Sequence, residues 1–196
     1  MYLINGTLSN SPPFRLHLED GRTRTSLHEM SEAQLAELNI FPCDEIKPPI
    51  TWTQYYDAPV IEVSDGRATA TYPVLDYSPE EVAGILEAAR ERKRSEIASA
   101  RWEAETAGID VNGFTVRTDR ESQSLITGAA LKAMQDEKYS CRWKTESGFV
   151  ELTALQISAV ADAVRTHVQA CFDREAELVA LIEAAESPEE LNEIVF

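Results

Sequence analysis

The sequence predicts an α+β protein in which a β-rich N-terminal domain precedes a mostly helical one. Before residue 78, short apolar runs alternate with turn-forming residues, a pattern typical of short strands. At Ser78 to Glu81 a helix-capping pattern opens a long helical stretch, and strand signals return between Asn112 and Leu152 before further long helices. We therefore expect two domains, residues 1–77 and 78–196, the second with a small antiparallel β-hairpin or sheet.

The N-terminal domain contains a hairpin and a short helix with clear local signals. Residues 60–63 and 68–72 are β-forming runs that flank Ser64-Asp65-Gly66, and Asp-Gly supplies the positive φ angles that a tight hairpin turn needs. Ser31 and Gln34 form a capping-box pattern, in which the Ser31 hydroxyl accepts from the backbone N–H of Gln34 while the Gln34 side chain reaches back. This pattern predicts a short helix after Ser31.

From about residue 41 to residue 59 the chain is rich in proline and aromatic residues. Prolines restrict the backbone and lack an N–H donor, so we predict an extended arm here. The arm carries Trp52, Tyr55 and Tyr56, and aromatic side chains are favoured at protein interfaces because they bury a large area at low entropic cost. These three are candidate partner-binding residues, and packing of the arm onto its own domain is an equally weighted alternative.

A long helix is predicted from Pro79 to about Ala107, with Gly108 as its C-terminal stop. Its apolar stripe is thin and is interrupted by charged residues between 90 and 96. Such a helix cannot be buried all round, so we expect part of it to form a stalk or to pair with another chain. In so acidic a protein, its basic cluster fits a solvated helix face or an ion-pair strip between subunits better than a nucleic-acid patch; the cluster comprises Arg90, Arg92, Lys93 and Arg94.

Between the long helices the sequence predicts a strand over residues 114–118, after a tight turn at Asn112-Gly113. Thr118 is predicted to cap the following helix, with Glu121 as its box partner. Asp119 and Glu121 could also form a carboxylate pair for acid–base catalysis, but negative charge in a first helical turn complements the helix dipole, and we favour capping. The residues that this helix is expected to bury are Leu125, Ile126, Ala129, Ala130, Ala133 and Met134.

Two further strands are predicted over residues 139–144 and 149–152, followed by an outgoing helix. Thr153 and Gln156 form another capping box at the start of this helix. Its apolar stripe continues almost to Ser187, which predicts a second long helix.

Composition limits the functional classes. The formal net charge of −16 makes direct binding to nucleic acid or to an anionic membrane surface unfavourable. No apolar run reaches membrane-spanning length, so we expect a soluble protein. The cysteines and histidines lack the spacing of metal ligands or of a disulfide framework; they are Cys43, Cys141, Cys171, His17, His28 and His167. We predict no catalytic residues, no cofactor and no metal site.

The order of elements in the C-terminal part is similar to that of a known family. The matching pattern comprises Arg92-Lys93-Arg94, Ile109 to Gly113, Phe114 to Asp119, Ser122 to Ala130, Arg142 to Thr145, Gly148, Thr153-Ala154, the helix from Val164 to Phe172, and Ile182 to Leu191. In this pattern residues from about Ser78 to Phe196 resemble a domain of unknown function found in tailed-phage and prophage proteins, often near tail-fibre genes. Residues 1–77 resemble, more loosely, N-terminal parts of phage tail and tail-fibre-assembly proteins.

The resemblance implies a non-enzymatic bacteriophage tail protein, a structural component of the tail tip, baseplate or tail-fibre region that acts through protein–protein contacts. Its expected partners are other phage tail or tail-fibre proteins and, through the long helices, further copies of itself. It would lie in the host cytoplasm during assembly and in the virion tail as a structural part. Two alternatives stay open: a tail-fibre assembly chaperone, and an acidic DNA mimic that inhibits a host protein, against which the dispersed charge counts.

Overall fold

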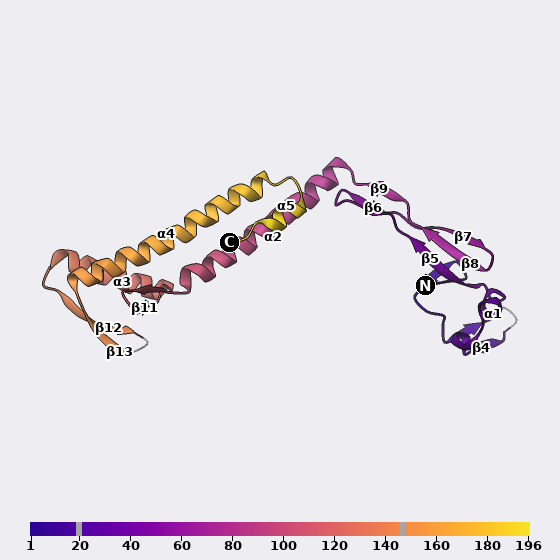
Figure 1. The fold of residues 1–196 in the computed structure, drawn as a ribbon, viewed down its shortest axis with the longest axis horizontal. Coiled ribbons are helices and arrows are strands. Elements are labelled where there is room, and N and C mark those ends of the chain that lie inside the picture. The colour runs from indigo at the N-terminus through magenta and orange to yellow at the C-terminus, as the bar shows by residue number, and fades with distance from the viewer. Residues whose placement is uncertain (19–20, 146–147) are drawn as a thin grey trace. The chain divides into compact units, whose positions relative to one another are not determined.

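The computed structural model describes residues 1–18, 21–145 and 148–196, and the chain divides into two compact units, Met1–Val82 and Ala83–Phe196. Strands and short helices make up the first unit, while long helices with two small hairpins make up the second (Figure 1). The predicted α+β class is confirmed. None of the helices in the described part of the chain is both long enough and apolar enough to cross a membrane.

The N-terminal unit is built on a five-stranded sheet with the strand order β2-β1-β5-β8-β7. In this sheet β5 and β8 run parallel, and the other neighbours pair antiparallel. Two smaller hairpin-like sheets, β3-β4 and β6-β9, complete the unit. The strands are β1 (Tyr2–Ile4), β2 (Thr7–Ser9), β3 (Arg15–His17), β4 (Thr23–Thr25), β5 (Ile40–Ile46), β6 (Gln54–Tyr56), β7 (Val60–Ser64), β8 (Arg67–Thr71) and β9 (Val74–Asp76).

The local signals of the N-terminal unit produce the structures predicted for them. β7 and β8 form a hairpin whose turn residues Asp65 and Gly66 have φ angles of 51° and 77°. A short 3₁₀ helix, η1 (Leu27–Glu29), precedes α1 (Glu32–Ala36). At α1 both halves of the capping box between Ser31 and Gln34 are present.

The prediction of an extended arm over residues 41–59 is wrong for its first part, because Ile40–Ile46 forms the central strand β5. Pro42 is tolerated there for a geometric reason. The N–H of Cys43 donates to the Met1 carbonyl oxygen (2.9 Å), which makes Met1 and Cys43 a hydrogen-bonded pair. Because hydrogen-bonded and non-hydrogen-bonded pairs alternate along an antiparallel ladder, the next pair, Tyr2 with Pro42, forms no hydrogen bond between β1 and β5. On the other side, pairing with β8 begins only at Cys43. The missing donor of Pro42 therefore costs no ladder hydrogen bond.

The C-terminal unit contains two long helices, two hairpins and two shorter helices. Its elements are α2 (Pro79–Thr106), β10 (Ile109–Val111), β11 (Phe114–Val116), α3 (Arg120–Gln135), β12 (Ser140–Thr145), β13 (Gly148–Thr153), α4 (Ala154–Ala184) and α5 (Pro188–Glu193). The hairpins β10-β11 and β12-β13 are separate two-stranded sheets. Asn112 and Gly113 form the predicted tight turn, with φ angles of 54° and 82°.

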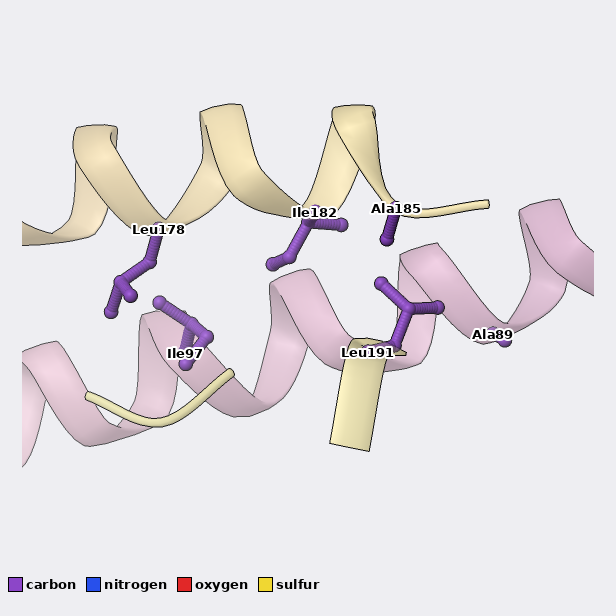
Figure 2. Close-up of a cluster of buried hydrophobic side chains, with 6 residues drawn as sticks. All are labelled: Ala89, Ile97, Leu178, Ile182, Ala185 and Leu191. Atoms are coloured by element: carbon purple, nitrogen blue, oxygen red, sulfur yellow. The ribbon is translucent and has the colours of Figure 1, made fainter. Parts of the chain in front are cut away.

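The apolar stripe of α2 packs against α4 of the same chain. Ile97 of α2 lies opposite Leu178 and Ile182 of α4, and Leu191 brings α5 onto the same cluster (Figure 2). Ile97 and Ile182 are almost completely buried, at 1% and 0% exposed. Part of the thin stripe that suggested a stalk or a partner chain is thus covered within the chain.

Helix α3 packs on α4 along a narrower face than predicted. Ile126 and Ala133, two helical turns apart, are buried, whereas Leu125 and Met134 are exposed by 58% and 78%. Each exposed residue is adjacent in sequence to a buried one, so it lies about 100° around the helix axis from the buried face. The prediction that α3 buries Leu125 and Met134 is therefore wrong.

Candidate functional site

A fully buried carboxylate, Glu105 near the end of α2, is the centre of a polar network in the C-terminal unit. Nη1 of Arg101 lies 2.5 Å from one carboxylate oxygen, and Nη2 of Arg120 lies 3.2 Å from the other. Nε2 of Gln123 donates to the second oxygen at 3.1 Å. Glu105 thereby ties α2 to the first turn of α3.

Arg101 extends this network to α4. Its Nε donates to Glu175 at 2.9 Å, and its guanidinium carbon lies 4.7 Å from the centre of the Phe172 ring. Desolvation by burial lowers the pKa of Arg101, but hydrogen bonds to Glu175 and Glu105 outweigh it, and the net effect raises the pKa. A partly buried cation held by two carboxylates is a structural cross-link, since the charges compensate one another.

Thr118 is not the N-cap of α3, contrary to the prediction. It is fully buried, its hydroxyl donates to the Glu105 backbone carbonyl (2.5 Å), and it accepts from the N–H of Gly108 (2.9 Å). Asp119 is the cap instead, accepting from the N–H of Ser122 at 3.1 Å. Thr118 joins the end of α2 to the strand-to-helix connection, which leaves capping to the next residue.

The carboxylate pair considered for catalysis thus separates into different roles. Hydrogen bonds from the backbone N–H and hydroxyl of Ser122 lower the pKa of Asp119. Glu121 does not complete a capping box and instead lines a groove described below. Within residues 1–18, 21–145 and 148–196, no three His, Cys, Asp or Glu side chains gather as a set that could hold a metal ion.

His167 and Cys171 of α4 lie beside the Glu105 network. Nε2 of His167 is 3.0 Å from the carbonyl oxygen of Ala104, and its distance to the Cys171 sulfur is 3.9 Å. Burial raises the pKa of the Cys171 thiol, which disfavours the thiolate. Nε2 of His167 therefore has a hydrogen-bond partner within the unit.

Most residues of the basic cluster of α2 contact other residues of the same chain. This arrangement differs from both interpretations of the sequence, a solvated helix face and an ion-pair strip between subunits. Arg94 pairs with Glu183 of α4 at 2.7 Å, and Nη2 of Arg90 donates to the Ala185 carbonyl at 2.8 Å. Lys93 is buried and pairs with Glu96 at 2.9 Å. The contacts of Arg94 and Arg90 hold the end of α4 to α2, whereas the Lys93 pair lies within α2.

A hollow of about 670 Å³ lies between β11, the start of α3 and β12; we call it the basic groove. Its charged lining is formed by Arg117, Arg142 and Lys144 with one acidic residue, Glu121. This groove was not among the sites predicted from the sequence. The alternation of Arg142 and Lys144 along a predicted strand was its only local signal, because the other lining residues come from separate elements.

Trp52, Tyr55 and Tyr56 lie in or beside β6 of the N-terminal unit and are partly exposed. The Tyr55 ring centre is 4.7 Å from that of Tyr77, and the Tyr56 hydroxyl donates to the Pro48 carbonyl oxygen. Tyr55 and Tyr56 therefore pack in part within their own unit, and a partner-binding role for the three residues stays a prediction.

Comparison with curated proteins and with solved structures found no significant similarity. A family of proteins does match: residues 88–195 fit the family described as "Domain of unknown function (DUF4376)". The match confirms the expected domain of unknown function in the C-terminal part of the chain, and it includes the Glu105 network, the basic groove, α3 and α4. Because the match covers more than half of the sequence, the chain belongs to the DUF4376 family.

Proposed function

We propose that the chain is a non-enzymatic bacteriophage tail protein, a structural component of the tail tip, baseplate or fibre region that works through protein–protein contacts. The phage context is supported by the resemblance of residues 78–196 to a domain of tailed-phage and prophage proteins. The protein-binding role is supported by the surface of the C-terminal unit.

The observation that carries this proposal is a groove of about 560 Å³ between α3 and α4, which we call the apolar groove after the large apolar side chains on its rim; polar residues such as Asp162, Arg165 and Gln169 complete its lining. Its rim includes Leu131, Met134 and Phe172, which are exposed by 57%, 78% and 38%. Large apolar side chains that share one hollow, in place of being scattered singly, mark protein-interaction surfaces. A groove between two helices suits the apolar face of a further helix, from a partner or a second copy.

The charged interior supports a binding role over a catalytic one. Arg101, Arg120 and Glu105 satisfy one another, and Arg101 is further held by Glu175. Catalytic acids and bases require access to a substrate, whereas the Glu105 carboxylate is fully buried. The ion pairs among these residues link α2, α3 and α4, which gives the residues a structural role.

Mass spectrometry of purified virions tests the proposal. The experiment uses the phage or induced prophage that encodes this chain, with a major tail protein as the positive control and an abundant host cytosolic protein as the negative control. We expect the chain in finished particles at a constant ratio to the tail protein. Its depletion from particles to the level of the host protein would overturn the structural role.

A tail-fibre assembly chaperone is the second candidate, favoured by the exposed apolar rim on an acidic chain. Such a rim can hold a partner transiently, and high net charge keeps the complex soluble. Here the chain would be absent from particles, and co-expression would raise the yield of soluble, trimeric fibre. Fibre that folds equally well without the chain would exclude this role.

A further inference from the structure

The basic groove differs in charge from the unit that contains it. Residues 83–196 carry 13 Lys and Arg and 21 Asp and Glu, a formal charge of −8. The charged lining of the groove, by contrast, is Arg117, Arg142, Lys144 and Glu121, which together carry a net charge of +2. A concave surface concentrates the field of its lining charges, so this hollow attracts anionic groups on an otherwise acidic protein.

The cations of the groove are available to a ligand. Across the described part of the chain, Arg142 and Lys144 have no ion pair, and both side chains are exposed. Glu151 lies opposite Arg142 in the hairpin but accepts a hydrogen bond from Ser140 at 2.9 Å. Arg117 pairs with Asp119 at 3.0 Å yet is 74% exposed, so a carboxylate from outside can share it.

One edge of β12 borders the groove. Four consecutive residues of β12, Arg142–Thr145, line the groove. Successive side chains of a strand point to opposite faces of its sheet, so a groove that contacts all four residues lies along the edge of the strand. β12 pairs with β13 on its other side, and β12-β13 is a two-stranded sheet in the described structure. Over Arg142–Lys144 the groove edge of β12 therefore offers backbone N–H and C=O groups to an added strand.

The lining also has an apolar part. Trp143 lines the groove while also packing against the cluster around Val164, and Leu125 beside it is 58% exposed. A ligand that fills the groove thus contacts cations and apolar surface together. Carboxylates alone, or a phosphate ion alone, would leave Leu125 exposed to water.

We propose that the basic groove binds an extended acidic protein segment, which adds as a strand to the edge of β12. Its carboxylates contact Arg117, Arg142 and Lys144, and an apolar side chain packs on Trp143 and Leu125. The proposal rests on the proposed function in one respect, that the unit acts by binding protein. Nucleic acid is disfavoured because it carries a phosphate at every nucleotide along its whole length and the chain has a formal net charge of −16, whereas a protein segment can place its few carboxylates opposite the three cations alone.

A peptide titration tests the proposal. The probe is a fluorescein-labelled peptide of alternating Glu and Val, and the control is the same peptide with Gln in place of Glu. Fluorescence anisotropy with the full chain should show binding of the Glu peptide that weakens between about 50 mM and about 300 mM NaCl, since the contact is electrostatic. The Gln peptide should not bind. Equal binding of both peptides, or no binding of the Glu peptide, would overturn the proposal.

Two double variants locate the site. R142E/K144E should weaken binding of the Glu peptide by about tenfold or more, because it reverses both free cations of the groove. R92E/K138E changes the net charge equally at exposed residues outside the groove and should stay within about twofold of the parent chain. An equal loss in both variants would show that binding is non-specific and would overturn the proposal.

Backbone NMR of the unmodified chain gives a readout that does not depend on any variant folding. Adding the Glu peptide should shift the amide signals of residues 142–145 in β12, and shifts confined to other elements would contradict strand addition. Inorganic phosphate and a single-stranded DNA octamer compete in parallel, and stronger binding of either would identify a phosphate site instead. A failure here leaves the virion experiment unaffected, so the two proposals can fail separately.

Discussion

Replacing Glu105 by alanine removes the buried carboxylate shared by Arg101 and Arg120. Arg101 then keeps only its pair with Glu175, and Nε2 of Gln123 loses an acceptor, so we expect the free energy of unfolding to fall by about 2 to 3 kcal/mol, the scale of a lost buried hydrogen bond to a charged group. Glu103, two residues earlier in α2, is exposed, and E103A should change it by less than about 0.5 kcal/mol. Urea unfolding of both variants measures the difference. Similar values for the two would show that the network contributes little stability.

Asp119 gives the C-terminal unit a defined pH dependence. Its folded-state pKa is lowered by hydrogen bonds from Ser122, so its contribution is complete above the unfolded-state pKa of about 3.9 and is lost as the pH falls through the lower folded-state value. D119N keeps a comparable cap without a titrating group. The stability advantage of the parent chain over D119N should shrink between pH 6 and pH 3 in urea unfolding. A constant difference over this range would contradict the prediction.

At the level of elements, the contact between α2 and α4 can be tested with two adjacent residues of α4. Ile182 is fully buried against α2, whereas Leu181 is 54% exposed. I182A should lower the free energy of unfolding by about 3 kcal/mol, because it removes buried methylene groups and leaves a cavity, and L181A by less than about 1 kcal/mol. Urea unfolding measures both, and equal effects would mean that α2 and α4 do not pack as described.

Local sequence signals predicted the elements whose partners lie close in sequence. Capping boxes at Ser31 and Thr153 join residues three apart, and both are present. The role of Thr118 depends on Gly108 and Glu105, which lie 10 and 13 residues away and approach it only after the β10-β11 hairpin turns back. A capping pattern takes account only of residues a few positions apart, so it could not reveal these contacts of Thr118. The cap was therefore predicted one residue too early, at Thr118 instead of Asp119.

The sites were less predictable than the elements for the same reason. Trp52, Tyr55 and Tyr56 were conspicuous as aromatics in a proline-rich stretch, although two of them contact their own unit. The basic groove requires β11, α3 and β12 to meet, and its cations come from separate segments of an acidic sequence. The net charge of the sequence is a sum over all residues, so it did not reveal that the basic groove is locally positive.

For the whole molecule, the apolar groove between α3 and α4 leads us to expect self-association. The double variant L131S/M134S removes two exposed apolar side chains of its rim, whereas L155S removes one that is 81% exposed on α4 outside the groove. Light scattering after size exclusion should give a multiple of 21.8 kDa for the parent chain and L155S, and a lower mass for L131S/M134S. A monomeric parent chain at about 100 μM would contradict this prediction, because any association with a Kd of about 1 μM would then give mostly oligomer.

We expect the fragment Ser78–Phe196 to fold without the N-terminal unit. Each of the five clusters of buried apolar side chains takes its members from one unit only, three of them from Ala83–Phe196. Starting at Ser78 keeps the capping box, in which the Glu81 carboxylate accepts from the Ser78 N–H at 2.8 Å and the Ser78 hydroxyl accepts from the Glu81 N–H at 3.3 Å. Since a helix cap is worth about 1 kcal/mol, a fragment that begins at Glu81 should be slightly less stable. Thermal unfolding followed by circular dichroism should give Ser78–Phe196 a single cooperative transition, and a gradual loss of helix would show that the unit needs residues 1–77 to fold.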